Sequence, residues 1–249
     1  MSSGLSQSLL SPTGGKASLR TERLGRLRGL YAIVVDGTAL APLALVDAVL
    51  RGGARVVQLR LKQAGTGEFL QIAREAVLRC RARGALLIVN DRPDVARLAA
   101  ADGVHLGQED LTIEAARQVV GEHALIGVST HGEEEIDAAL AAGADYLGFG
   151  PIFTTSTKSA TAPGARPLPP PHGVAGLIEA VVRARGTPLV AIGGITARNA
   201  GELARSGAAC VAAIGEICGA PDPSDAARVL RETFSGRLAT GSSGARVGR

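Results

Sequence analysis

Tryptophan is absent from this chain of 249 residues, and aromatic residues make up 2% of it. Because proteins that hold single-stranded nucleic acid stack its bases on aromatic side chains, this composition argues against such a partner. The three cysteines, Cys80, Cys210 and Cys218, are too few and too scattered for a disulfide framework or a zinc cluster. The sequence has no apolar run of about 18 residues, as a membrane helix needs, and its Ser- and Gly-rich start lacks the apolar core of a secretory signal. We therefore expect a cytoplasmic protein with reduced thiols and no membrane partner.

The net charge of +4 is concentrated at the two ends of the chain. The basic residues there are Arg20, Arg23, Arg26, Arg28, Arg246 and Arg249. Because this excess lies outside the periodic part of the sequence, we expect no nucleic-acid partner. We interpret residues 1–28 as a flexible basic segment, or a loose helix against the floor of the domain, and residues 237–249 as a disordered tail.

Hydrophobic residues are abundant, at 46% of the chain, and they fall into eight short apolar runs that each precede a helix-like stretch. Six predicted strands are residues 30–35, 55–59, 85–89, 103–106, 125–128 and 145–149, and the last two end before Gly193 and Ile214. Helical spacing of apolar residues begins at Pro42 and stops at Gly52. This alternation predicts a parallel sheet, and the length suits one domain. We expect residues 29–236 to form a single (β/α)8 TIM barrel with α/β architecture.

Polar residues gather where these strands are predicted to end, which is where barrel enzymes place their chemistry. Gln58, Arg60 and Lys62 alternate along the second run, so they face one side. Burying unpaired charges costs several kcal/mol, so an anionic ligand such as a phosphorylated substrate would compensate them. An exposed basic loop is the alternative.

Acidic residues follow the next two strands, in Asn90-Asp91-Arg92 and in Gln108-Glu109-Asp110. Asp91 and Asp110 together suit Mg²⁺, which prefers carboxylate oxygens combined with phosphate and water. The alternative for Asp110 is a cap on the helix that starts near Thr112.

Glycines follow the last two strands, as Gly193-Gly194 and Ile214-Gly215. These loops most often form the phosphate cup of a barrel, and Thr196 with a new helix directly after the first pair favours that use. Tight turns are the alternative. Residues 159–172 are rich in proline, which predicts either a lid or a stiff surface connection. The four histidines are scattered, and no Ser-His-Asp, zinc, Walker or dinucleotide pattern fits its context.

Several phrases resemble the thiamine-phosphate synthase family, also called thiamine-phosphate pyrophosphorylase. They are residues 58–62, 88–92, 101–110, 127–131, 143–153, 155–158 and 191–195. The resemblance extends from Leu30 to about Phe234, in the order of the family. It implies an enzyme that joins hydroxymethylpyrimidine diphosphate to a thiazole phosphate, releases pyrophosphate and makes thiamine phosphate.

The resemblance also implies roles for individual residues. The pyrimidine diphosphate would bind Gln58, Leu59, Arg60, Leu61, Lys62, Asn90, Ser129 and Lys158, of which Arg60, Lys62, Ser129 and Lys158 would be catalytic. The thiazole phosphate would bind Thr155, Ser156, Thr157, Gly194, Ile214 and Gly215, and Mg²⁺ would bind Asp91 and Asp110. The partners are therefore small-molecule substrates, and the sequence leaves a homo-oligomer open.

This chain departs from the family pattern at Leu61, Thr154 and Gly215, where the family usually has Glu, Pro and Ser or a similar residue. Glu216 is unexpected beside a phosphate. Two rival functions remain: the related thiazole tautomerase, in which His131 would be the acid and base, and a barrel that binds a thiamine precursor or a protein without catalysis. Asp110 and residues 155–158 favour the synthase.

Overall fold

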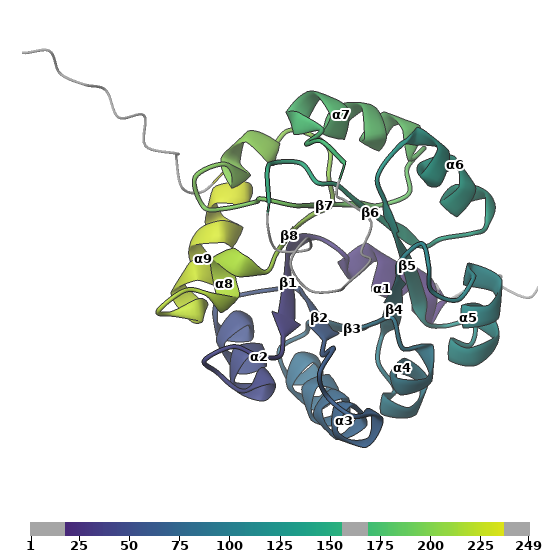
Figure 1. Cartoon of the computed structure of the whole chain (residues 1–249), viewed down its shortest axis with the longest axis vertical. Coiled ribbons are helices and arrows are strands. Elements are labelled where there is room, and N and C mark those ends of the chain that lie inside the picture. The colour runs from purple at the N-terminus through teal and green to yellow at the C-terminus, as the bar shows by residue number, and fades with distance from the viewer. Residues whose placement is uncertain (1–17, 156–168, 237–249) are drawn as a thin grey trace, which may run out of the picture.

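The structure, a computed structural model, describes residues 18–155 and 169–236. Its strands form one closed barrel in which each strand pairs in parallel with its neighbours in sequence, and β8 pairs with β1 (Figure 1). The strands are β1 (Gly29–Val35), β2 (Val56–Arg60), β3 (Leu86–Asn90), β4 (Gly103–Leu106), β5 (Leu125–Thr130), β6 (Tyr146–Phe149), β7 (Leu189–Ile192) and β8 (Cys210–Ala213). The predicted single (β/α)8 barrel is confirmed.

Helices surround the barrel in the order of the chain, except the first, which lies across one end of it (Figure 1). They are α1 (Leu19–Arg26), α2 (Pro42–Arg51), α3 (Thr66–Ala82), α4 (Pro93–Ala99), α5 (Ile113–Val120), α6 (Glu133–Ala141), α7 (Gly173–Arg183), α8 (Gly215–Cys218) and α9 (Pro223–Phe234). Pro42 occupies the first position of α2, where its fixed φ suits a helix and its missing N–H costs nothing. Proline begins α4 and α9 in the same way.

The helix expected directly after Thr196 is absent, and a short 3₁₀ turn, η1 (Ala200–Leu203), takes its place. The side chain of Asn199 explains the difference. Its Oδ1 accepts from the backbone N–H of Thr196 at 2.8 Å, and its Nδ2 donates to the Gly194 carbonyl at 2.9 Å. These bonds close residues 194–199 into a turn that competes with helical hydrogen bonding.

The hydrophobic core has two layers separated by the strands. Leucine, valine and alanine side chains between the strands and the helices form the larger layer. The smaller layer fills the inside of the barrel and includes Tyr31, Ile33, Leu86, Tyr146 and Val190. Side chains alternate between the two layers along each strand because successive residues of a strand point to opposite faces. The barrel is therefore a packed core that opens only at its ends.

Helix α1 lies across the end of the barrel where the strands begin, here called the floor. Arg20 pairs with Asp145, and Arg23 pairs with Asp102 at 3.0 Å. Arg117 in α5 also binds Asp145, at 2.7 Å. Arg20 and Arg23 thus hold α1 against buried carboxylates.

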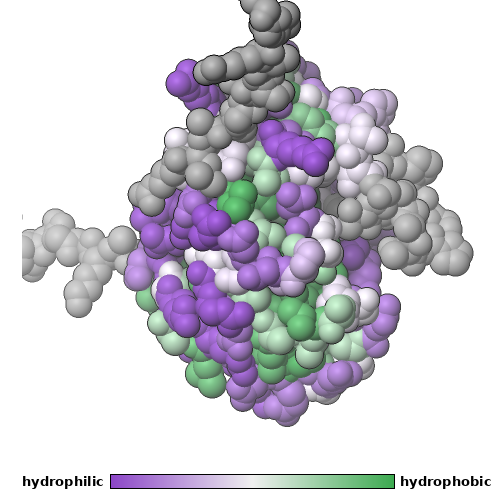
Figure 2. All heavy atoms as spheres, turned by 90° about the vertical axis from the view of Figure 1, so that its left-hand side faces the viewer, coloured by the Kyte–Doolittle hydropathy of each residue, from purple (hydrophilic) through white to green (hydrophobic). Residues whose placement is uncertain are grey.

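The side of the barrel over α8 and α9 carries mostly hydrophilic residues, with hydrophobic residues in scattered patches (Figure 2). Within the described ranges, no helix is both long and apolar enough to span a bilayer. The predicted tail at 237–249 and most of the proline-rich segment lie outside the described residues.

Candidate active site

The site lies at the end of the barrel where the strands finish, here called the mouth, and β2 brings three of the predicted residues there. Gln58 faces the barrel interior and is buried, with 3% of its surface exposed. Arg60, the last residue of β2, is partly exposed, and Lys62 just beyond it is exposed. The alternation thus places an amide inside the barrel and two cations at its mouth. Gln58 is therefore not part of an exposed basic loop, which was the alternative interpretation of this segment.

Leu59 and Leu61 lie on the opposite face of the same segment. Both are buried in the layer between the strands and the helices. Their side chains therefore face away from the barrel interior, and only their backbone atoms are available to a ligand there. Leu61, one of the departures from the family pattern, is accommodated by this apolar layer.

Asp91 and Asp110 come together at the mouth, from the loops after β3 and β4. Burial, together with the neighbouring Asp110 carboxyl, raises the pKa of Asp91 to about 6, against the lowering effect of Lys62 and Arg60. The Lys62 Nζ lies 4.0 Å from Asp91 Oδ2. Asp91 has a φ of 61°, a left-handed conformation that costs energy in most residues other than glycine and that clusters at functional sites.

Asp110 is held by the loop rather than by the following helix. Its Oδ2 accepts from the Gly107 N–H at 2.6 Å. The cap of α5 is Thr112, whose hydroxyl accepts from the Ala115 N–H at 3.2 Å. The alternative role of Asp110 as a helix cap is therefore wrong.

Two neighbouring carboxylates supply some of the oxygen ligands that a hard cation such as Mg²⁺ needs. Across residues 18–155 and 169–236, no group of three or more His, Cys, Asp and Glu side chains could hold a metal by itself. Mg²⁺ is commonly bound by one or two carboxylates, with substrate phosphates and water completing its octahedron. Asp91 and Asp110 fit this pattern, because their carboxyl groups lie within hydrogen-bonding distance of each other and the Asp91 side chain is partly exposed at the mouth.

Asn90 and Ser129 lie near the ends of β3 and β5, on the inner side of the barrel. Asn90 is the last residue of β3 and is 9% exposed. The Ser129 hydroxyl lies 2.9 Å from Nε2 of His105, and the Ser129 carbonyl accepts from Gln108 Nε2 at 2.5 Å. The loop that carries Asp110 is thereby tied to β5.

A cavity of about 150 Å³ opens at the ends of β5 to β8. Ser129, Thr155, Gly194, Ile214 and Gly215 are among its lining residues. Of the predicted residues for the thiazole phosphate, all that the structure describes therefore line one cavity. Ser156, Thr157 and Lys158 lie outside the described residues.

The glycine pair of this cavity is required by close backbone contacts. Gly193 and Gly194 have φ values of 101° and 66°. A Cβ on Gly194 would lie 2.5 Å from the Thr154 carbonyl oxygen, and one on Gly193 would lie 2.6 Å from the Cα of Pro151. The loops after β6 and β7 can pack this closely only without side chains at these two positions.

Glu216 lines the same cavity, but its carboxylate is already bonded. Its Oε1 accepts from the Ala197 N–H at 2.9 Å. This contact directs the carboxylate toward the loop after β7 and explains how an acidic residue is tolerated beside Gly215.

The sequence pattern did not single out one pair of residues in the structure. Tyr31 and Tyr146 meet inside the barrel, with 3.0 Å between their hydroxyl oxygens. The available signal was that the sequence has two tyrosines, each in a predicted strand. His131, the acid and base expected for the rival tautomerase, lines the cavity and lies 3.0 Å from Glu135 Oε2 through its Nδ1.

Comparisons with known proteins point to one family. A family model described as thiamine monophosphate synthase matches residues 30–217. A thiamine-phosphate synthase of Anaeromyxobacter dehalogenans (strain 2CP-C) is 45% identical over 227 residues, covering 91% of this chain and 97% of that protein. Another, of Chlorobium luteolum, is 45% identical over 197 residues, or 79% and 89% of the two chains.

A solved structure resembles the barrel as well. It is a thiamine phosphate pyrophosphorylase from Pyrococcus furiosus, with a TM-score of 0.75 and 35% sequence identity, and the match covers 87% of this chain and 99% of that one. The residues matched by the family model include both carboxylate loops and the loops that line the cavity.

Proposed function

This chain belongs to the thiamine monophosphate synthase family, and we propose that it makes thiamine phosphate. The substrates are 4-amino-2-methyl-5-hydroxymethylpyrimidine diphosphate and 4-methyl-5-hydroxyethylthiazole phosphate, or the carboxylated form of the thiazole. The enzyme is a transferase: the bond between the pyrimidine methylene and the diphosphate oxygen breaks, and the thiazole nitrogen forms a new bond to that methylene. Pyrophosphate leaves.

One observation carries this proposal. Cationic side chains and a carboxylate pair converge at the mouth, and the same end of the barrel holds a glycine-lined cavity. A diphosphate needs cations and a metal, and a phosphate monoester needs backbone donors without side chains in the way. The mouth therefore has one region suited to a diphosphate and another suited to a phosphate monoester.

The pyrimidine diphosphate binds on the β2 to β5 side of the mouth. The residues proposed to hold it are Gln58, Arg60, Lys62, Asn90, Ser129 and Lys158, with the backbone of Leu59 and Leu61. Arg60, Lys62 and Lys158 neutralise negative charge as it develops on the departing pyrophosphate, and Ser129 positions the pyrimidine. No protein nucleophile is needed, because the thiazole nitrogen attacks the carbocation that the departing pyrophosphate leaves at the methylene.

Asp91 and Asp110 are the proposed ligands of Mg²⁺. When bound, Mg²⁺ stabilises the charge on the leaving pyrophosphate as a Lewis acid. Lys62 lies near Asp91, and Arg60 also lowers the pKa of that carboxyl. These cations oppose the effect of burial and favour the ionised form of Asp91, which is the form that binds a metal.

The thiazole phosphate occupies the cavity. Thr155, Gly194, Ile214 and Gly215 line it, and Ser156 and Thr157 follow Thr155 directly in sequence. With both substrates bound at adjoining ends of the strands, the reacting nitrogen and carbon are brought together, and this proximity supplies much of the rate acceleration.

Thiazole tautomerase activity is the second candidate function, and one observation favours it. His131 lines the cavity with its Nδ1 3.0 Å from Glu135, an arrangement that suits proton transfer to a bound thiazole. A tautomerase has no use for the carboxylate pair, which favours the synthase.

The experiment mixes purified protein with both substrates, in Mg²⁺ and separately in EDTA, and measures thiamine phosphate and pyrophosphate. We expect equal amounts of both products with Mg²⁺ and none with EDTA, with activity restored by excess Mg²⁺. If no product forms while the protein is folded, the proposal is wrong, and proton exchange on the thiazole phosphate alone would then identify a tautomerase. Absence of both reactions would leave the non-catalytic barrel.

A further inference from the structure

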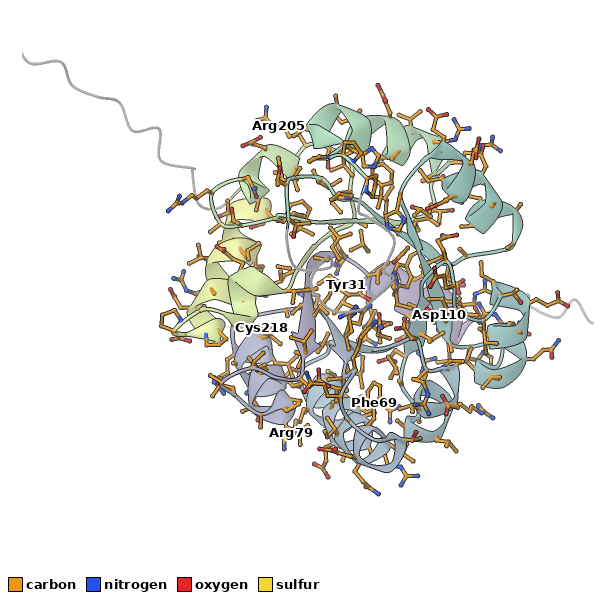
Figure 3. The ribbon with its side chains drawn as sticks, viewed as in Figure 1. Tyr31, Phe69, Arg79, Asp110, Arg205 and Cys218 are labelled. Atoms are coloured by element: carbon orange, nitrogen blue, oxygen red, sulfur yellow. The ribbon has the colours of Figure 1, made fainter. Side chains whose placement is uncertain are left out.

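A continuous chain of hydrogen bonds crosses the interior of the barrel. Gln58 Nε2 donates to the Tyr31 hydroxyl at 2.9 Å, and the Tyr31 and Tyr146 hydroxyls are 3.0 Å apart. The Tyr146 hydroxyl lies 3.1 Å from His105 Nδ1, and His105 Nε2 lies 2.9 Å from the Ser129 hydroxyl. Figure 3 shows Tyr31 within the ring of strands. The chain joins β2 to β5, and both of its ends are residues proposed to hold the pyrimidine.

Once the orientation of the Gln58 amide is set, every hydrogen bond of this chain has a defined donor and a defined acceptor. The Gln58 NH₂ group can only donate, so the Tyr31 oxygen accepts from it and its own proton goes to Tyr146. Tyr146 then donates to Nδ1 of His105. A neutral imidazole that accepts at Nδ1 carries its proton on Nε2, which donates to Ser129.

Two outcomes follow at the ends of the chain. One N–H of the Gln58 amide is donated to Tyr31 inside the barrel, which orients the amide so that its carbonyl oxygen is on the other arm and is available to a ligand. The Ser129 oxygen accepts from His105, so its hydroxyl proton is free to be donated to a ligand. One end is therefore an acceptor and the other a donor.

Two strand glycines make room for the rings of this chain. A Cβ on Gly127 in β5 would lie 2.0 Å from Cζ of Tyr146. A Cβ on Gly148 in β6 would lie 3.1 Å from Cε1 of His105. Glycine inside a strand is destabilising relative to alanine. Glycine at these two positions leaves the space that the rings of Tyr146 and His105 occupy.

The two phenols are kept in the protonated form. Burial raises the pKa of Tyr31, and burial also raises the pKa of Tyr146 well above its usual value. Both hydroxyls therefore carry their protons at neutral pH and can act as donors in the chain.

We propose that Tyr31, Tyr146 and His105 are positioning residues that make the site select a 4-aminopyrimidine over a 4-oxopyrimidine. This inference rests on the proposed function. A 4-amino group donates to the Gln58 carbonyl, and a ring nitrogen on the other side of the pyrimidine accepts from Ser129, which lies across the barrel. A 4-oxo group presents an acceptor to the Gln58 carbonyl, and two acceptors facing each other repel.

Binding of the two pyrimidine diphosphates in Mg²⁺, measured by isothermal titration calorimetry, tests this selection. The probes are 4-amino-2-methyl-5-hydroxymethylpyrimidine diphosphate and its 4-oxo counterpart. For the intact protein we expect the amino compound to bind about 100-fold more tightly, since one lost hydrogen bond and one unpaired polar group each contribute about tenfold. In Tyr146→Phe the Gln58 amide can turn over, so this preference falls to about tenfold or less.

A matched control separates positioning from packing. Val190→Ala removes buried volume from the same inner layer without touching the hydrogen-bond chain. We expect it to lower the Tm and to leave the preference for the amino compound unchanged. If Tyr146→Phe fails to fold, Tyr31→Phe breaks the chain at the adjoining bond and is expected to lower the preference in the same way. A preference that is unchanged in a folded tyrosine variant would contradict the inference.

The protonation of His105 gives a second readout that requires no substrate. We expect ¹⁵N NMR of the free protein to show the neutral form of His105 with its proton on Nε2, with the signal assigned through His105→Gln. A proton on Nδ1 would reverse the chain and contradict the inference. If the intact protein binds neither pyrimidine diphosphate, the proposed function itself is wrong, which is a different result from loss of preference.

Discussion

The two ends of the barrel treat charged side chains in opposite ways. At the floor, Asp145 is buried, and it accepts from Arg20, from Arg117 and from the Ile126 N–H. At the mouth, 32% of the Asp91 side chain is exposed, and its ion pair with Lys62 is stretched to 4.0 Å. The carboxylate at the floor is fully bonded within the protein, whereas the carboxylate at the mouth can still bind a ligand.

The same segments of chain supply both ends. Asp102 immediately precedes β4 and binds Arg23, while Asp110 follows the same strand and belongs to the carboxylate pair at the mouth. A buried charged side chain stabilises a fold only if groups of the protein satisfy all of its hydrogen bonds and its charge. A charged side chain that binds a ligand must instead leave some of this bonding capacity unused. Substitutions at the two ends should therefore separate stability from activity.

The largest expected effect is on catalysis at the mouth. Asp91→Asn keeps a residue that tolerates the φ of 61° and removes one carboxylate from the pair. Losing a metal ligand removes several kcal/mol of charge stabilisation, so we expect kcat/KM to fall about 10³-fold. The Tm should stay the same or rise, because repulsion from Asp110 is relieved. Steady-state kinetics and thermal unfolding measure the two effects, and near-normal activity would show that Asp91 is not a metal ligand.

The largest expected effect on stability is at the floor. Asp145→Ala leaves two arginines and the Ile126 N–H without their buried acceptor. Breaking such a pair costs about 3 kcal/mol of unfolding free energy, which lowers the Tm by about 6 to 12 °C in a domain of this size. The kcat of the folded protein should not change.

A surface carboxylate provides the control for the floor. Asp137 pairs with Arg183 at 2.6 Å, but both side chains are substantially exposed. Such pairs contribute little, so Asp137→Ala should leave the Tm unchanged. An equal loss of Tm in both variants would remove the contrast between buried and exposed carboxylates.

A smaller effect is expected at the cavity. Gly194→Ala would place a Cβ 2.5 Å from the Thr154 carbonyl oxygen, so the loops that line the cavity must shift. We expect the KM for the thiazole phosphate to rise about tenfold, as for one lost hydrogen bond to a charged group, with the KM for the pyrimidine diphosphate unchanged.

Gly186→Ala is the matched variant for the cavity. Gly186 has a φ of 89°, and a Cβ there would meet nothing within 4 Å. It therefore introduces backbone strain without a clash near the site. We expect a lower Tm and an unchanged KM for both substrates; a raised thiazole KM in this variant would attribute the effect at Gly194 to strain alone.

The sequence was sufficient for the architecture and for the side chains that follow the strands. The apolar runs predicted the strands to within a residue or two, and two of them were placed one residue early for a physical reason. The predicted strands 55–59 and 85–89 stop before the polar residues Arg60 and Asn90, yet these two residues pair with Val35 and His105 in the sheet. An inward-facing polar residue at a strand end does not interrupt the backbone ladder.

Contacts across the barrel could not be predicted in the same way. Tyr31 and Tyr146 are separated by 115 positions, and their hydrogen bond depends on closure of the barrel. The turn that Asn199 closes was also missed, since a helix after a glycine pair is the usual arrangement in these barrels. Local patterns thus identified residues on single strands, while pairings between strands required the three-dimensional structure.

The smallest expected effect is at Glu216, whose negative charge repels the thiazole phosphate that is proposed to bind beside it. Glu216 lines the cavity and accepts from the Ala197 N–H at 2.9 Å. Glu216→Gln keeps an acceptor for that N–H and removes a negative charge beside the thiazole phosphate. Two charges separated by several ångströms and screened by water interact by about 0.5 to 1 kcal/mol, so we expect the thiazole KM to fall about threefold. The Tm should not change. A KM that instead rises would mean that the Glu216 charge stabilises the cavity loop, and the mouth would then resemble the floor at this position.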